Sequence, residues 1–383
     1  MRTEPMKWFD LDAPIFAFSH CRDVVAAVCR NGGIGALGTT HLTAEQLEIE
    51  LTWLDAHTND RPYAVDLMFA ANAPQELEGI ARPEDVDGLI PEGHTRWVEN
   101  LLSEFGVPEF TPEESRTILA DYLKGMVRTH DKAKRGLEVV LRHPLAQMIV
   151  SALGPPPPDV MTEAKARGLK VAAMVGHPKH VKYHKAAGVD LLISCGYEAA
   201  GHTGDIATFV LTPQIVDSAY PIPVLHAGGV GRGRQIAAAL ALGASGVWTG
   251  TIWLTTPESE ATPLTRRMIF EGESDDTLRS KCGTGKYARR LKSRWVTAWE
   301  EPDAPPTLGM PLQSILINEA LERMNKYQPE GLWSYPAGQV IGMLTNERDV
   351  KTIMQDMMFE FGDTLENLGG FLKEDEVADH AGA

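Results

Sequence analysis

Three glycine-rich segments carry the residue types that could do chemistry. The first, Gly196–Gly204, contains His202 and follows the apolar run Asp190–Cys195, which has the composition of a buried strand. In barrel enzymes the loops at the carboxyl ends of the strands hold the reacting groups. His202 is therefore a candidate functional residue. The alternative is that His202 only forms hydrogen bonds within its own loop.

The other two segments, Gly228-Gly229 and Gly250-Thr251, have the pattern of a phosphate site. Each follows an apolar run and precedes a helix-like run, so backbone N–H groups and a helix dipole can face an anion. In (β/α)8 barrels the loops after the seventh and eighth strands form such a site. There is no Walker loop, and the dinucleotide pattern is only partial at Gly228–Gly233. Flavin mononucleotide (FMN) or a phosphorylated substrate therefore fits best, although these glycines could simply make tight turns.

Eight apolar runs ending in small residues alternate with amphipathic runs, as expected for parallel β-α-β units. The predicted strands are 15–18, 34–38, 63–69, 147–153, 170–175, 190–195, 223–227 and 246–250. An open doubly wound sheet would give a similar pattern strand by strand. The count of eight favours an α/β fold of the (β/α)8 TIM-barrel type.

The segments outside these units predict additions to the barrel. Residues 1–255 are expected to form the barrel, with a helical insertion after the third strand at about 71–142, because no single crossover is that long. Residues 256–339 are expected to form a smaller helical cap or substrate domain, and residues 340–383 a helix that returns to the barrel. The basic run 286–294 is interpreted as an exposed helix face, or alternatively as a site for an anionic substrate.

Composition excludes several classes of protein. The net charge of −16 disfavours a nucleic-acid partner, and no apolar run is long enough to span a membrane. The four cysteines lack metal-ligand spacing, and His177, His180 and His184 are accompanied by lysines typical of a solvated helix. We therefore expect no bound metal, reduced thiols and a cytoplasmic enzyme acting on a small molecule. The oligomeric state stays open, with a homodimer as one option.

The chain resembles the nitronate monooxygenase family, also called the 2-nitropropane dioxygenases, which are FMN-dependent barrels. The resemblance covers most of the chain. It is carried by Pro14–Phe16, Asn31–Gly35, Glu198–His202, Ala227–Gly229, Gly250-Thr251 and Ala337–Gln339.

The resemblance implies a site and a reaction. FMN would contact Phe18, Ser19, His20, Asp66, Ala200, Gly201, Gly228, Gly229, Gly250 and Thr251. His202 would act as the base in the oxidation of alkyl nitronates or nitroalkanes by dioxygen to a carbonyl compound and nitrite. Several positions depart from the family pattern, one of them Cys195, where a more polar residue is frequent. Phe18-Ser19-His20 stands where Ala-Pro-Met is usual, and Asp66 replaces a common asparagine.

Two other functions stay open at this point. Related barrels use FMN with NAD(P)H to reduce quinones or enoyl thioesters, and the insertion at 71–142 could reshape the barrel mouth for such substrates. The chain could also be a non-catalytic barrel that binds a phosphate ligand.

Overall fold

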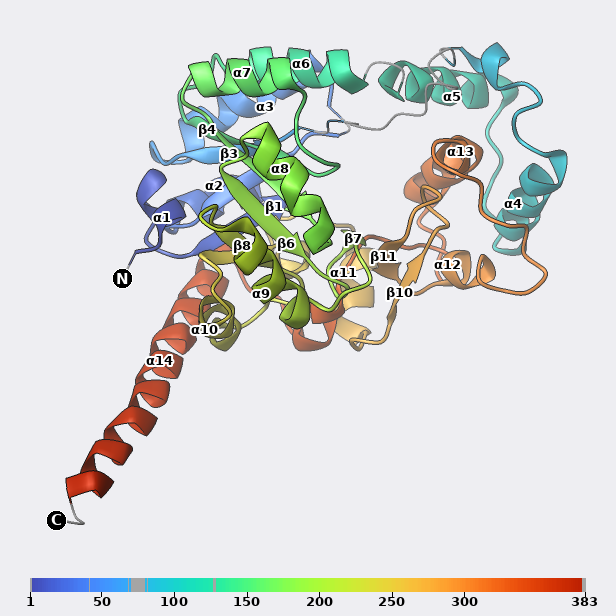
Figure 1. The fold of residues 1–383 in the computed structure, drawn as a ribbon. Coiled ribbons are helices and arrows are strands. Elements are labelled where there is room, and N and C mark those ends of the chain that lie inside the picture. Colours follow the sequence, from blue (N-terminus) through green and yellow to red (C-terminus); the bar gives the residue numbers. More distant parts are fainter. Residues whose placement is uncertain are drawn as a thin grey trace.

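Eight parallel strands close into a barrel in the computed structural model (Figure 1). The structure describes residues 2–40, 42–67, 69, 80, 82–126 and 129–380. The barrel strands are β1 (Ile15–Ser19), β2 (Ile34–Gly38), β3 (Tyr63–Asp66), β4 (Ala146–Ser151), β5 (Lys170–Val175), β6 (Leu191–Cys195), β8 (Val224–Ala227) and β9 (Gly246–Thr249). Pairing of β1 with β9, in which Phe16 lies opposite Trp248, closes the sheet and excludes the open alternative. The predicted TIM barrel is confirmed.

The interior of the barrel is a packed apolar core. Alternate residues of the strands point inward, among them Phe16, Met148, Ile193 and Trp248. The short helix α1 (Glu4–Trp8) and the residues after it add Met6, Phe9 and Leu11 to this core. The barrel is therefore filled, and the functional loops lie at the carboxyl ends of the strands.

Helices surround the barrel, as the alternating pattern predicts. They are α2 (Arg22–Arg30), α3 (Ala44–His57), α6 (Thr129–Val140), α7 (Pro158–Ala166), η3 (Pro178–His180), α8 (Val181–Ala187), α9 (Thr208–Ala219) and α10 (Gly233–Ala241). The last position is taken by α14 (Val350–His380), whose first half packs against α10 and α2 through Ile353, Met354 and Met357. Its second half extends away from the body of the molecule (Figure 1).

The region after β3 contains η2 (Pro83–Val86), α4 (Glu92–Glu104), α5 (Pro112–Met126) and α6. Helix α6 packs on α3 and α7, as a regular barrel helix does. Helices α4 and α5 instead pack on α13 (Leu312–Tyr327), on one side of the barrel (Figure 1). Residues 71–79 lie outside the described residues. Within the described part, the region is helical as expected, and two of its helices belong to the packing of the cap.

The cap is not purely helical. It contains η4 (Thr251–Thr255), α11 (Pro263–Glu271), β10 (Thr277–Ser280), β11 (Ala288–Leu291), α12 (Arg294–Ala298), α13 and η5 (Gln339–Met343). Strands β10 and β11 form a hairpin, and β7 (Gly201–His202) joins it as a third strand. The interpretation of 286–294 as a helix face is therefore wrong. Cross-strand pairing, in which Ser280 lies opposite Ala288, decides the conformation, and charged residues carry little signal for it. The domain boundaries at 255 and 339 stay predictions.

Candidate active site

Four loops meet at the carboxyl end of the barrel. The amide of Gln339 donates to the carbonyl of Glu198 at 3.0 Å, and the amide of Gly338 donates to Thr251 Oγ1 at 2.9 Å. A Cβ on Gly338 would lie 2.8 Å from the Glu198 carbonyl oxygen, so only glycine fits there. A Cβ on Gly228 would lie 3.5 Å from that of Ala199. The three glycine-rich segments and the 337–339 segment therefore form one site.

The predicted phosphate loops present unused backbone donors. Within the described part of the chain, no acceptor faces the amides of Gly229, Gly250 and Thr251. Gly228 and Gly229 have positive φ angles of 134° and 70°, which glycine adopts at little cost, and a Cβ on Gly250 would meet open space. Free amides beside a helix N-terminus bind anions, so this cradle fits the phosphate of a flavin mononucleotide.

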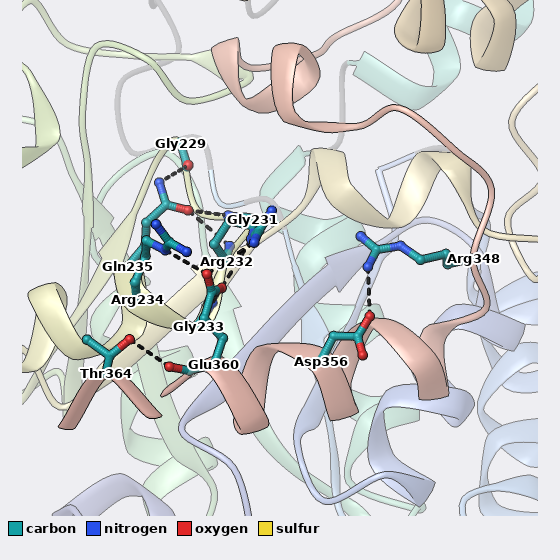
Figure 2. A network of polar contacts seen from close by, with 10 residues as sticks. All are labelled: Gly229, Gly231, Arg232, Gly233, Arg234, Gln235, Arg348, Asp356, Glu360 and Thr364. Atoms are coloured by element: carbon teal, nitrogen blue, oxygen red, sulfur yellow. Dashed lines mark hydrogen bonds and ion pairs between the residues drawn. The ribbon is translucent and has the colours of Figure 1, made fainter. Parts of the chain in front are cut away.

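The side chain of Gln235 fixes the shape of this loop. Its Nε2 donates to the Gly229 carbonyl at 2.7 Å, and its Oε1 accepts from the amides of Gly231 and Arg232 at 2.8 and 3.0 Å (Figure 2). The loop is therefore held in place by the protein, with its free amides already oriented.

Glu360 of α14 binds the N-terminus of α10 directly behind the loop. Its carboxylate accepts from the Gly233 amide at 2.7 Å, from Arg232 Nε and Nη2 at 3.1 Å each, and from Arg234 Nε at 2.6 Å (Figure 2). Burial would raise the pKa of Glu360, but these hydrogen bonds outweigh it and lower the pKa to about 2. A residue of the C-terminal helix thus stabilises the helix that follows the predicted phosphate loop.

The Glu360→Ala variant is expected to lose about 1–3 kcal/mol of stability at pH 7, since charge-assisted hydrogen bonds at a helix N-terminus are broken. Because the pKa of Glu360 is lower in the folded protein, its ionised carboxylate contributes its full stabilisation above about pH 4.5. This contribution is lost as the pH falls toward 2 and the carboxylate is protonated. The difference in unfolding free energy between wild type and variant should therefore shrink from pH 7 to pH 3. Denaturant unfolding at both pH values measures it, and a pH-independent difference would contradict the assigned charge.

A second polar group without a partner lies at the end of β3. Asp66 is buried, its Oδ1 has no partner among the described residues, and burial raises its pKa to about 7. A buried carboxyl oxygen without a donor is costly unless a ligand supplies one. The N–H of a flavin pyrimidine ring is such a donor, so Asp66 fits the predicted cofactor.

The end of β1 supplies the neighbouring residues. The Phe18 ring lies 5.1 Å from the His20 ring and 6.2 Å from that of Trp248, between centroids. His20 Nδ1 is 3.0 Å from the Gly38 carbonyl, and burial lowers the His20 pKa. Ser19 Oγ accepts from the Cys21 amide at 3.0 Å, so its hydroxyl is used by the local turn. The predicted cofactor contacts of this segment stay predictions.

His202 lies on β7, between the barrel and the cap hairpin. Gly201 before it has a φ of 67°, which allows the chain to turn from Ala200 into the strand. The ring keeps access to solvent, with Nδ1 3.3 Å from the Tyr287 carbonyl and Nε2 3.5 Å from Thr284 Oγ1. Desolvation lowers the His202 pKa, and nearby Lys286 and Arg290 lower it further, against the opposing effect of the Tyr287 carbonyl. The imidazole of His202 is therefore neutral at pH 7.

Two buried residues near the site have structural surroundings. His226 Nδ1 lies 2.8 Å from Thr212 Oγ1, and burial lowers the His226 pKa to about 4. Burial raises the pKa of Cys195 to about 12, so it is a thiol rather than a thiolate. Both act as core residues at neutral pH.

Sequence reasoning missed residues of the site that come from the cap and from the barrel helices α10 and α14. Thr284 and Tyr287 contact His202 from the β10–β11 hairpin, and Gln235 and Glu360 hold the phosphate loop. The only signal for a cap contribution was the 337–339 segment. The contacts of Thr284, Tyr287 and Glu360 join residues that lie 82 to 127 positions apart, and those of Gln235 depend on one side chain, so neither kind leaves a pattern in the sequence.

Other kinds of site receive no support from the described residues. They contain no group of three or more His, Cys, Asp or Glu side chains placed to hold a metal ion. None of the helices described is long and apolar enough to cross a membrane. All four cysteines are buried and unpaired.

Comparisons with known proteins identify relatives of this chain and solved structures with the same fold. A Mycobacterium tuberculosis protein named "Putative monooxygenase Rv1533" is 44% identical over 379 residues, which cover 97% of this chain and 100% of that protein. The solved structure of a nitroalkane oxidase from Streptomyces ansochromogenes has a TM-score of 0.75 at 24% identity, and covers 95% of this chain and 99% of that chain. The enoyl reductase domain of MlnA from Bacillus amyloliquefaciens has a TM-score of 0.61 at 13% identity, covering 95% and 97%.

The two solved structures share the fold of this chain at less than 25% identity. The sequence model of the nitronate monooxygenase family matches residues 11–360, which is most of the chain. This chain therefore belongs to the nitronate monooxygenase family of flavin-dependent enzymes.

Proposed function

We propose that this enzyme binds FMN and oxidises alkyl nitronates or nitroalkanes with dioxygen to a carbonyl compound and nitrite, with His202 as the catalytic base. The observation that carries the proposal is the placement of a neutral imidazole at the same barrel end as a cradle of backbone amides that have no protein acceptor among the described residues. The family match supports the reaction class.

The residues present fit FMN at both ends. The free amides of Gly229, Gly250 and Thr251 would hold the phosphate, and the Asp66 carboxyl would accept an N–H from the pyrimidine ring. When bound, the flavin would supply the electron-transfer chemistry with dioxygen that no side chain can perform.

The hydrogen bonds of His202 decide which nitrogen acts. A carbonyl oxygen only accepts, so Nδ1 carries the proton and donates to Tyr287, which leaves the lone pair on Nε2. Nε2 takes the proton from the carbon beside the nitro group. The C–H electron pair then moves onto the nitro group and gives the nitronate. A nitronate supplied as such needs no base.

The pH dependence follows from the lowered pKa of His202. For neutral nitroalkanes, kcat/KM should fall at acid pH with a midpoint below pH 6.5, since the base is lost only when the imidazole is protonated. Steady-state rates between pH 4.5 and 8.5 measure this midpoint. With preformed nitronates, kcat/KM should not show this decrease at acid pH, because no proton has to be removed by His202. An identical decrease for both substrates would argue against His202 as the base.

The flavin spectrum of the purified protein tests the proposal as a whole. We expect a yellow protein that releases FMN on denaturation and forms nitrite from a nitronate in air. The reductase alternative, in which NAD(P)H reduces a quinone or an enoyl thioester, predicts rapid anaerobic bleaching by NADH and no nitrite. A colourless protein that cannot be reconstituted with FMN would favour a binding role.

A further inference from the structure

Arg290 lies on the same face of the cap sheet as the proposed base. His202 on β7 pairs directly with Ala288 on β11, and directly paired residues of antiparallel strands project to the same side. Side chains alternate along a strand, so Arg290, two residues beyond Ala288, projects to that side as well. Its effect on the His202 pKa agrees with this placement.

The guanidinium of Arg290 is held only by neutral groups. Its Nε lies 3.3 Å from Ser334 Oγ, and its Nη2 donates to the Ser334 carbonyl at 3.2 Å. No carboxylate in the described part of the chain forms an ion pair with it. By contrast, Arg279, on the opposite face, pairs with Asp205 at 2.8 Å. Arg290 is thus a half-buried cation without a countercharge.

The free edge of this guanidinium faces a glycine. A Cβ on Gly283 would lie 3.2 Å from Nη1, so a larger residue there would crowd this edge. Nη1 has no protein partner among the described residues, and burial lowers the Arg290 pKa. A half-buried cation of this kind gains free energy when an anion pairs with it.

We propose that Arg290 binds the anionic oxygens of the nitronate, with Nη1 as the donor. This inference rests on the proposed function, whose substrate is a planar anion with its charge shared by two oxygens. A guanidinium recognises such an anion as it does a carboxylate. When the substrate is a neutral nitroalkane, Arg290 stabilises the charge that develops on the nitro oxygens as His202 removes the proton. One residue therefore serves both forms of the substrate.

Kinetics of the FMN-loaded Arg290→Met and Arg290→Lys variants test this role. For Arg290→Met, we expect the KM for a preformed nitronate to rise about 30-fold or more, the loss expected for one charge-assisted hydrogen bond. The KM for the neutral nitroalkane should change less than about threefold while its kcat falls. Arg290→Lys should recover part of the nitronate affinity. The matched control is Lys292→Met, because Lys292 is an exposed cation two residues further along that donates to the Asp275 carbonyl.

Binding of nitrate provides a readout that does not depend on turnover. Nitrate is an inert planar anion, and its binding to the FMN-loaded protein can be followed by calorimetry. Wild type and Lys292→Met should bind it, and Arg290→Met should bind it at least about tenfold more weakly. Equal nitrate affinity in Arg290→Met, or loss of flavin as its main defect, would overturn the proposal. If wild type binds nitrate through Arg290 yet forms no nitrite from nitronates, then the proposed reaction fails while the anion site stands.

Discussion

The His202→Asn variant is expected to keep its flavin and to lose at least about 100-fold in kcat for neutral nitroalkanes, the lower end of what a general base contributes. Asparagine is the sharpest choice because its side-chain amide can still donate toward the Tyr287 carbonyl, 3.3 Å from Nδ1 in the wild type. Its amide nitrogen has no basic lone pair. The substitution therefore removes the base while keeping a similar polar contact.

The comparison of two substrates makes this prediction specific. Turnover of a preformed nitronate should fall less than about tenfold in His202→Asn, because that substrate has already lost its proton. Added imidazole should restore part of the nitroalkane activity, since the missing function is a neutral base. Flavin content and the thermal midpoint serve as controls for folding. Undiminished nitroalkane turnover, or equal losses on both substrates, would exclude His202 as the base.

The barrel was predictable because its signals are local. A parallel strand buried on both faces gives a continuous apolar run, as in Leu191–Cys195, and the helix before this strand, α8, ends at Gly188, whose φ is 79°. The order of strands follows from such units because parallel crossovers connect neighbours. The predicted strands therefore match the observed ones to within a few residues.

The cap could not be predicted in the same way because its strands depend on distant partners. The two residues of β7 gain their strand pairing from Ala288 and Arg289, which lie 86 and 88 positions further along the chain. Nothing local in Gly201-His202 indicates a strand. The C-terminal helix differs from the cap, because the sequence already indicated a helix within 340–383 that returns to the barrel, and the first half of α14 packs on α10 and α2.

The residues of the candidate site fall into the same two groups, those with a local sequence pattern and those that depend on distant partners. The segments containing His202, Gly229 and Gly250 were recognisable because small residues at strand ends have a local pattern. Glu360 was not recognisable, because it is an ordinary charged residue in sequence, and Arg290 was indicated only by the alternative interpretation of the basic run 286–294 as a site for an anionic substrate. The role of such a charged side chain depends on whether an opposite charge lies next to it, and only the folded structure determines this.

The Gly233→Ala variant is expected to destabilise the protein by about 2–3 kcal/mol, a typical cost of adding a methyl group where there is no room. A Cβ at this position would lie 2.0 Å from the Met357 carbonyl oxygen and 2.4 Å from the Phe361 nitrogen. The backbones of α10 and α14 thus touch at Gly233. The alanine must push α14 away and weaken the contact of Glu360 with the Gly233 amide, which is 2.7 Å in the wild type.

The matched control is Gly362→Ala on α14 itself, where an added Cβ meets nothing within 4 Å. This second alanine should be neutral or stabilise the helix by up to about 1 kcal/mol, the difference in helix propensity. Denaturant unfolding compares the two variants. Because α10 begins directly after the phosphate loop, Gly233→Ala should also weaken FMN affinity, measured by flavin fluorescence, while Gly362→Ala should not. If the two variants were equally stable, α14 would not pack on α10 as closely as the structure shows. The proposed effect of the C-terminal helix on the predicted phosphate loop would then be disproved.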